Sequence, residues 1–481
     1  MSIFPSDSPP ETFPARRYLP WYRRCLPSWR TVAIAMLLLL ATPFAIRGYC
    51  LWRIPDVPVP FDVEAFCELP SIEDNAYTDF ARAANLLTPL TLDSETSNRW
   101  PDRLVWSELP AALRTAVIAQ RPALDAYREG AARASSSLVP PQKYTISISL
   151  PVVRSARELQ RLAYLDALRL MDVGNHREAA EVLHSAVRAS RHLGRRGCML
   201  ERLVGSACHA NVMPGWHQWS RDPNVTADDI ETALVRLRAD WKLTPPPSDS
   251  YKAEYFFIVN ESKWPMRLLW DEINDMIDGW TTKKLGFSAY PTLAKVNTRV
   301  PGWQIPILWI MGEPERTARA GRLFLSHELK YCDLPFTEQP VQLPNAHRLH
   351  QGTELVAGLT ATELNQRLDG TFFGTFNLQG PFLQAMRAEA ARQTLLETEL
   401  EWQIRLRRAN AITRADAEAL LAEFPWPVDP CCKAGKPIQY RVTEDGLVIG
   451  SLGRDGIDQR GDPSSTLRDD EVIVIPWPSK N

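Results

Sequence analysis

The stretch SARELQRLAYLDALRLMDVGNHREAAEVLHSAVRASRHL, residues 155–193, decides the architecture expected of this chain. Small or apolar side chains recur at helical spacing in its second half, at positions 179, 182, 183, 186, 187, 190 and 193. That spacing places them on one face of a helix, which should therefore be buried. Gly174 and Asn175 interrupt the pattern between segments 155–173 and 176–193. We therefore predict two helices packed as an antiparallel hairpin.

Helical patterns continue on both sides of this hairpin. Three pairs of residues have the spacing of helix caps, namely Ser71 with Asp74, Thr226 with Asp229 and Thr413 with Asp416. Pro122 should bend or split the second helix, and Pro214-Gly215 should end the helix that begins at residue 199. Helices are expected at residues 71–87, 110–133, 199–213, 226–241, 249–279, 313–331, 360–367, 382–409 and 413–423.

The composition changes after residue 423. KPIQYRV and LVIGSL flank Asp445-Gly446, a dipeptide typical of a hairpin turn. EVIVIPW adds a strand, and Pro476 places the end of that strand at a sheet edge. The predicted fold class is therefore mainly α, with an N-terminal transmembrane helix, a multi-helix extracytoplasmic domain packed from hairpins, and a small C-terminal antiparallel β unit.

An apolar segment near the N-terminus predicts a membrane anchor. TVAIAMLLLLATPFAI, residues 31–46, is uncharged, and extension to Trp52 gives the length of a membrane span. Five arginines precede the segment and only two closely follow it, which places the N-terminus in the cytoplasm. We expect a single-pass protein of the bacterial inner membrane with its bulk outside the cytoplasm. A cleaved signal peptide and a buried core helix are the alternatives.

These features divide the chain into five parts. We expect residues 1–28 to be a disordered cytoplasmic tail and 29–52 the transmembrane anchor. Residues 53–70 should be a proline-rich linker, followed by an α-helical domain at 71–380. Residues 381–481 should hold a long helix and the β tail.

Charge and motifs exclude several classes of function. The net charge of −2 does not suit a basic nucleic-acid binder, so we expect no nucleic-acid partner. The sequence contains no Walker A, dinucleotide-binding, H-E-x-x-H or G-x-S-x-G motif. It also has no C-x-x-C pair, and we expect Cys431 and Cys432 to be free thiols rather than a strained disulfide.

Three groups of residues are candidates for chemistry. Glu261, Asp271, Glu272 and Asp275 lie near tryptophans and could form a sugar-cleaving site, or simply a solvated acidic face. His176, His184 and His192 are eight residues apart, so they should spiral around a helix as surface or boundary residues. Cys208, His209 and His217 could be metal ligands, although the expected break at Pro214 separates them.

Two parts of the chain resemble known families. Ala167, Gly174, Ala179, Leu183 and Ala186 give residues 155–193 a resemblance to a single tetratricopeptide-type hairpin. The tail, in DP-(x)4-GKPIQYR, DGLVIGSLGRDGIDQRGD and DDEVIVIPW, is similar to the C-terminal region of the major pseudopilin of type II secretion systems. That resemblance implies a calcium ion with candidate ligands Ser451, Leu452 through its carbonyl, Asp455, Asp469 and Asp470. A Gly/Asp-rich surface turn is the alternative.

The whole chain also resembles a set of bacterial envelope proteins without a known activity. They share an N-terminal anchor, a first helix like NAYTDFARAANLL, the 155–193 hairpin and this tail. We predict a membrane-anchored scaffold or interaction protein without catalytic activity or cofactor that presents helical grooves to a protein partner. A secretion-related protein is a variant of this prediction. The alternative is an envelope hydrolase that uses carboxylates within residues 249–280, and calcium is the alternative cofactor.

Overall fold

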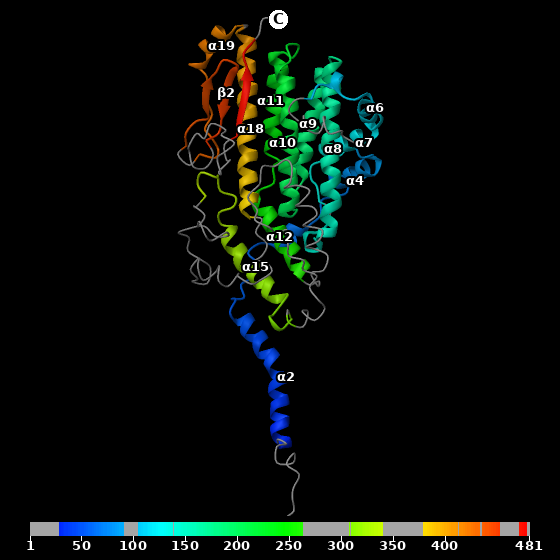
Figure 1. Ribbon diagram of the computed structural model, residues 1–481, viewed down its shortest axis with the longest axis vertical. Helices are drawn as coiled ribbons and strands as arrows, with labels where there is room; N and C mark the ends of the chain where they lie inside the picture. Colours follow the sequence, from blue (N-terminus) through cyan, green and yellow to red (C-terminus); the bar gives the residue numbers. More distant parts are fainter. Residues whose placement is uncertain are drawn as a thin grey trace, which may run out of the picture.

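The computed structural model describes residues 28–90, 104–137, 139–262, 307, 309–339, 379–411, 413–432, 435–452 and 471–478. It is an elongated, mainly helical molecule with a single small antiparallel sheet among the described residues. A bundle of long helices forms the body, the sheet lies on one side of it, and helix α2 projects from one end (Figure 1). The predicted mainly α architecture with a C-terminal β unit is confirmed.

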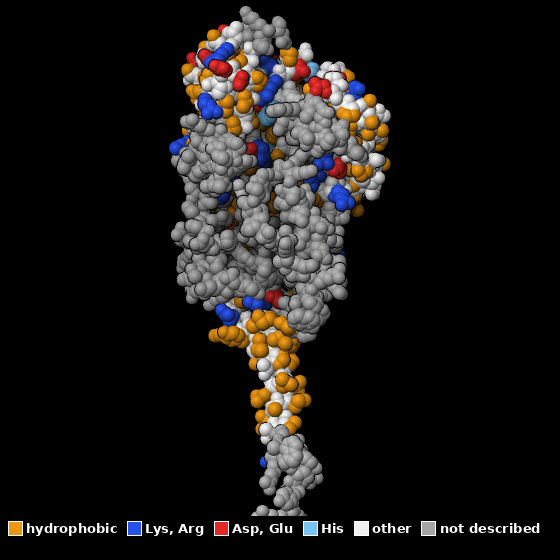
Figure 2. All heavy atoms as spheres, viewed as in Figure 1, with side chains coloured by type: hydrophobic (Ala, Val, Ile, Leu, Met, Phe, Trp, Pro, Cys, Tyr) orange, Lys and Arg blue, Asp and Glu red, His pale blue; other side chains and the backbone are white. Residues whose placement is uncertain are grey.

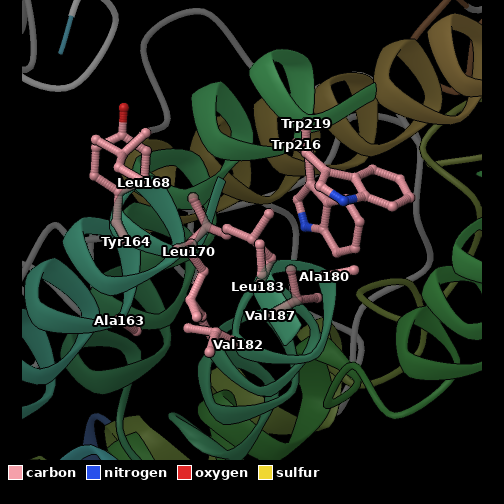
Figure 3. Close-up of a cluster of buried hydrophobic side chains, with 14 of the residues drawn as sticks. Ala163, Tyr164, Leu168, Leu170, Ala180, Val182, Leu183, Val187, Trp216 and Trp219 are labelled. Carbon is pink, nitrogen blue, oxygen red and sulfur yellow. The ribbon is translucent and has the colours of Figure 1, made fainter. Parts of the chain in front are cut away.

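The predicted hairpin forms the centre of the body. Helix α8 (Ile146–Asp172) and α9 (His176–His192) are joined by Gly174, whose φ of +76° favours glycine. The side chain of Asn175 accepts the N–H of Glu178 at 3.3 Å and so caps α9. Side chains from both helices, including the fully buried Leu183, interdigitate in the main core (Figure 3).

The prediction that Pro214-Gly215 ends the third helix of this region is wrong. Helix α10 (Met199–Arg221) continues through both residues. A Cβ atom on Gly215 would lie 2.8 Å from Cδ2 of Leu183, so the glycine allows α10 to pack tightly against α9. Trp216 and Trp219 follow directly and are buried in the same core. Tertiary packing of these two large side chains therefore outweighs the local helix-breaking tendency.

The N-terminal helices pack beside the hairpin, on the side away from the sheet (Figure 1). Asn75, rather than the expected Ser71, caps helix α4 (Ala76–Leu86), and its side chain also bonds the backbone of Ser137. Ser71 and Asp74 instead bond each other at 2.7 Å in the preceding turn. The predicted split near Pro122 is confirmed, since α6 (Ala111–Ala119) ends before α7 (Arg121–Ala132). The expected linker contains the short helix α3 (Val63–Cys67).

The remaining described helices lie close to their predicted ranges. Two of the three predicted capping pairs form capping boxes, Thr226 with Asp229 and Thr413 with Asp416. Of the helix expected at 249–279, the structure describes the part up to residue 262, and the helix expected at 360–367 lies outside the described residues. The elements are α11 (Ala227–Trp241), α12 (Pro247–Ser262), α15 (Glu315–Glu328), α18 (Gln379–Arg408) and α19 (Arg414–Leu421).

The C-terminal sheet has the order β1-β2-β3 and is antiparallel throughout. Its strands are β1 (Gln439–Val442), β2 (Gly446–Gly450) and β3 (Val472–Pro476). Leu447 pairs with Ile475, and both are buried in a core shared with Trp402 of α18. Pro476 ends an edge strand, as predicted, because the missing N–H of proline does no harm there.

Helix α2 (Trp29–Trp52) is long and apolar enough to cross a membrane, and the apolar part of it is not buried in the protein. Its side chains form an orange column below the body in Figure 2.

Candidate functional site

A groove of about 250 Å³ opens between α4 and the α8–α9 hairpin. Its lining is mainly apolar and includes several alanines, which leave the space that larger side chains would fill. The main contributors are Tyr77, Phe80, Ala81 and Ala84 from α4, Ala156 and Leu159 from α8, and Ala189 and Leu193 from α9.

Aromatic packing and buried hydrogen bonds hold the floor of the groove. The Phe80 ring lies edge-on to His192, with centroids 5.8 Å apart, and also contacts Tyr127. Tyr127 donates its hydroxyl to Gln160 Oε1 at 2.6 Å, and Gln160 Nε2 donates to the Cys208 carbonyl at 3.0 Å. Burial raises the pKa of Tyr127 well above its usual range, so this hydroxyl stays a donor. These contacts hold two residues of the lining, Phe80 and Tyr127, against the helices behind them.

The expectation that the three spaced histidines are surface or boundary residues is wrong for His184 and His192, which are buried at 3% and 5% exposure. His184 packs on Trp216 with ring centroids 4.7 Å apart, and burial lowers its pKa. Burial also lowers the pKa of His192 to about 4, which keeps its ring neutral beside the groove. Hydrophobic neighbours on α4, α7 and α10 cover these positions, and the spacing within α9 alone does not reveal this.

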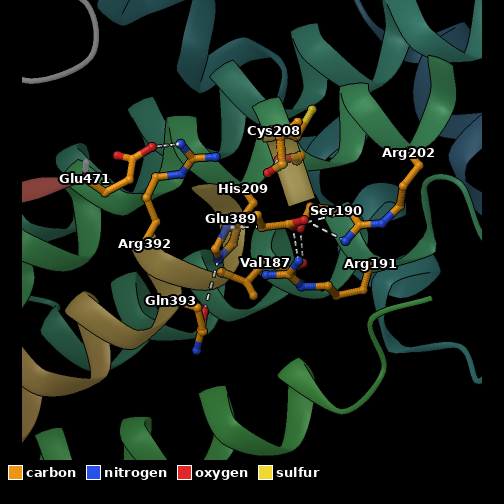
Figure 4. A network of polar contacts seen from close by, with 12 residues as sticks. Val187, Ser190, Arg191, Arg202, Cys208, His209, Glu389, Arg392, Gln393 and Glu471 are labelled. Atoms are coloured by element: carbon orange, nitrogen blue, oxygen red, sulfur yellow. Dashed lines mark hydrogen bonds and ion pairs between the residues drawn. The ribbon is translucent and has the colours of Figure 1, made fainter. Parts of the chain in front are cut away.

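A buried ionic network fastens α18 to the hairpin and α10 (Figure 4). Glu389 of α18 pairs with Arg191 of α9 and with Arg202 of α10, the second pair at 2.6 Å between Oε2 and Nη2. All three side chains are at most 2% exposed. Burial alone would raise the pKa of Glu389, but the two guanidinium groups lower it to about 2. The Arg191 guanidinium also stacks over Trp241 at 4.6 Å.

Cys208, His209 and His217 bond different partners. Cys208 is fully buried, and burial raises its pKa to about 12. His209 bonds Gln393 Oε1 at 3.1 Å, and burial together with Arg191 lowers its pKa well below the usual value. His217 bonds Glu399 at 2.5 Å. Among the described residues, no group of three His, Cys, Asp or Glu side chains could hold a metal ion.

Two buried carboxylates lie near the start of α10. Tyr144 donates its hydroxyl to Glu201 Oε2 at 2.5 Å, and Glu254 Oε2 accepts the N–H of Met199 at 3.0 Å. Burial and the nearby Glu201 raise the pKa of Glu254 to about 7. Neither Glu201 nor Glu254 was singled out from the sequence. The signal for Glu254 was its spacing, which places it on the same helical face as the apolar Tyr251 and Ile258.

The predicted acidic site is otherwise outside what the structure describes. Glu261 lies in α12, and its side chain is not among those described. Asp271, Glu272 and Asp275 lie outside the described residues. The structure therefore describes the side-chain contacts of Glu254 but not those of the four acidic residues predicted to form the site.

Two of the five predicted calcium ligands lie in the described part of the tail. Both bond the fully buried Asp429, through the Ser451 hydroxyl at 2.9 Å and the Leu452 N–H at 2.7 Å. Asp429 also accepts the N–H of Cys431, and it thereby links the start of the tail to the end of β2. Asp455, Asp469 and Asp470 lie outside the described residues. Cys431 and Cys432 are free and buried.

No family model, curated protein or solved structure matches this chain.

Proposed function

We propose that this protein is a single-pass scaffold of the bacterial inner membrane that holds an apolar segment of a partner protein in the α4–α8–α9 groove. The observation that carries the proposal is the groove itself, open to solvent and lined mainly by apolar side chains of three helices. A helical or extended segment would place one or two apolar side chains in it.

The size of the groove supports a protein partner over a small ligand. Its volume of about 250 Å³ is below the roughly 300–1,000 Å³ of pockets that enclose drug-sized molecules. Ala81, Ala84 and Ala156 leave room for a close approach of a second backbone. Anchoring side chains in small preformed pockets are the usual source of affinity between proteins.

The buried contacts behind the groove favour binding without a large ordering cost. The Tyr127–Gln160–Cys208 hydrogen bonds fix α7 and α10 against α8. The Glu389 pairs fix α9 against α18. A preformed groove loses little conformational entropy when it is filled, which raises affinity.

The membrane placement rests on α2 and on the arginines before it. Helix α2 has the length and apolarity for one span, and the excess of arginine on its N-terminal side favours a cytoplasmic N-terminus. The body and its groove would then face the outside of the cytoplasmic membrane. A role in secretion rests on the resemblance of the tail alone.

The hydrolase alternative rests on Glu254, whose raised pKa would suit a general acid. Glu254 is only 4% exposed, however, and one of its oxygens accepts the first N–H of α10. This geometry supports a structural role better than a catalytic one.

Affinity purification of the full-length protein from native membranes tests the scaffold proposal. The wild type is compared with A84W, which fills the groove, and with V235W, which adds the same bulk at an exposed site on α11. We expect at least one protein to co-purify with the wild type and V235W and to be lost with A84W, while all three chains keep the same thermal midpoint. Equal recovery of every co-purified protein with A84W would reject the groove as the binding site.

A further inference from the structure

A second apolar surface lies at the base of the body, immediately before α15. Ile307, Trp309 and Met311 are 46%, 42% and 37% exposed. Figure 2 shows hydrophobic side chains gathered at this end of the body, where α2 leaves it, with basic side chains just above them. Exposed groups of large apolar side chains in folded proteins mark interaction surfaces.

Contacts with α2 fix the position of this apolar surface along the helix axis. The Trp309 ring lies edge-on to Phe44, with centroids 5.4 Å apart. The Arg47 guanidinium lies 4.9 Å from the centre of the same ring and donates to the Trp309 carbonyl. A Cβ atom on Gly312 would lie 3.1 Å from Leu51, so this backbone packs closely on α2. Trp309 is therefore held beside the last third of α2.

The charges on α2 leave it little freedom to slide through a bilayer. Arg30 and Arg47 bound a run of sixteen uncharged residues, which at about 1.5 Å per residue spans roughly 24 Å. The hydrocarbon core of a bilayer is about 30 Å thick, so both arginines already lie at or just inside its boundaries. Phe44 lies within the uncharged run. Any placement of α2 across a membrane therefore puts Trp309 at the hydrocarbon boundary on the side of the body, which is the outer side in the orientation proposed above.

We propose that Ile307, Trp309 and Met311 insert into the outer interface of the same bilayer that α2 crosses. Tryptophan prefers this depth because its ring is amphipathic. The Arg47 guanidinium beside the ring donates to the Trp309 and Glu313 carbonyls, and an arginine at this depth can extend its charged end to the headgroups, so Arg47 is compatible with the insertion. The inference rests on the proposed anchor and adds a second attachment, which sets the angle between the body and the membrane.

Spin-label accessibility in the full-length chain, reconstituted into phosphatidylcholine–phosphatidylglycerol vesicles, tests the insertion. A nitroxide is attached at M311C, in a chain whose Cys25 and Cys50 are replaced by serine. L39C, on the exposed surface of α2, is the lipid reference, and V235C on α11 is the water reference. We expect the ratio of oxygen to nickel-complex collisions at M311C to be several-fold higher than at V235C and to approach that at L39C. I307C repeats the measurement with a second side chain.

The reference labels at L39C and V235C distinguish a failure of the proposed insertion from a failure of the proposed membrane anchor. Lipid-like collisions at L39C with water-like collisions at both M311C and I307C would overturn the insertion and leave the anchor intact. Water-like collisions at L39C itself would overturn both.

Discussion

Glu389 links α18 to two helices that are far from it in the sequence. It lies in the first half of α18, and its two arginine partners come from α9 and α10, nearly two hundred residues earlier. In the sequence, Glu389 is one of several charges that bar the long helix from a membrane. Its partners could not be predicted, because nothing local to residues 382–409 indicates which arginines it meets.

Replacing Glu389 by glutamine should destabilise the protein strongly. The E389Q substitution leaves two buried guanidinium groups without a counter-charge, which costs about 3–5 kcal/mol. E397Q on the same helix is the matched control. Its partner Arg238 is 46% exposed, so the loss should stay below about 1 kcal/mol. Denaturant unfolding of both full-length variants in detergent checks this difference, and similar losses would contradict the account.

Glu254 should make stability depend on pH in the opposite sense to a paired carboxylate. Its pKa is raised from 4.5 to about 7 in the folded state, so the folded protein holds the proton more tightly. The stability that Glu254 contributes is full below pH 4.5 and is lost as the pH rises through 7. E254Q, which stays neutral, should therefore match the wild type near pH 4.5 and exceed it by about 1–3 kcal/mol at pH 8. Unfolding midpoints that differ equally at both pH values would refute this.

At the scale of elements, the hairpin, the split at Pro122 and two capping boxes could be predicted because each depends on residues close together in the chain. Ser71 was the wrong cap, since the Asn75 side chain gains additional bonds to the distant Ser137. The continuation of α10 through Pro214 was not predicted either, because it too depends on contacts between residues far apart in the sequence. Its stability comes from burial of Trp216 and Trp219 against α9, which is a long-range contact.

Two glycines of α10 should respond differently to alanine. A Cβ atom on Gly205 would lie 2.7 Å from the Ser190 carbonyl, which is backbone and cannot yield easily. The gain in helix propensity, about 1 kcal/mol, should be outweighed, so G205A should lose about 1–2 kcal/mol net. At Gly215 the nearest atom is the end of the Leu183 side chain, and G215A should lose less. Thermal unfolding of the two variants compares them, and a more stable G205A would contradict the packing argument.

At the scale of the whole molecule, distant segments of the chain converge on one body. Helix α18 packs against α10 and α11, the sheet packs against α18, and α15 leads back to the apolar helix α2 (Figure 1). The class of fold could be predicted from periodicity, but the groove could not, because α4 and the hairpin meet only in three dimensions. The calcium ligands at Asp455, Asp469 and Asp470 and the acidic residues at 271–275 stay predictions.

The central claim is that a protein segment occupies the α4–α8–α9 groove. Site-specific photo-crosslinking in living cells tests it most directly, with a benzoylphenylalanine at Asn85, an exposed residue of the groove lining. Val235, which is exposed on α11, is the control outside the groove. We predict a discrete crosslinked protein from position 85 that is absent from position 235 and that disappears when A156W fills the groove. Crosslinks of equal yield from both positions, or a position-85 product unaffected by A156W, would contradict the account.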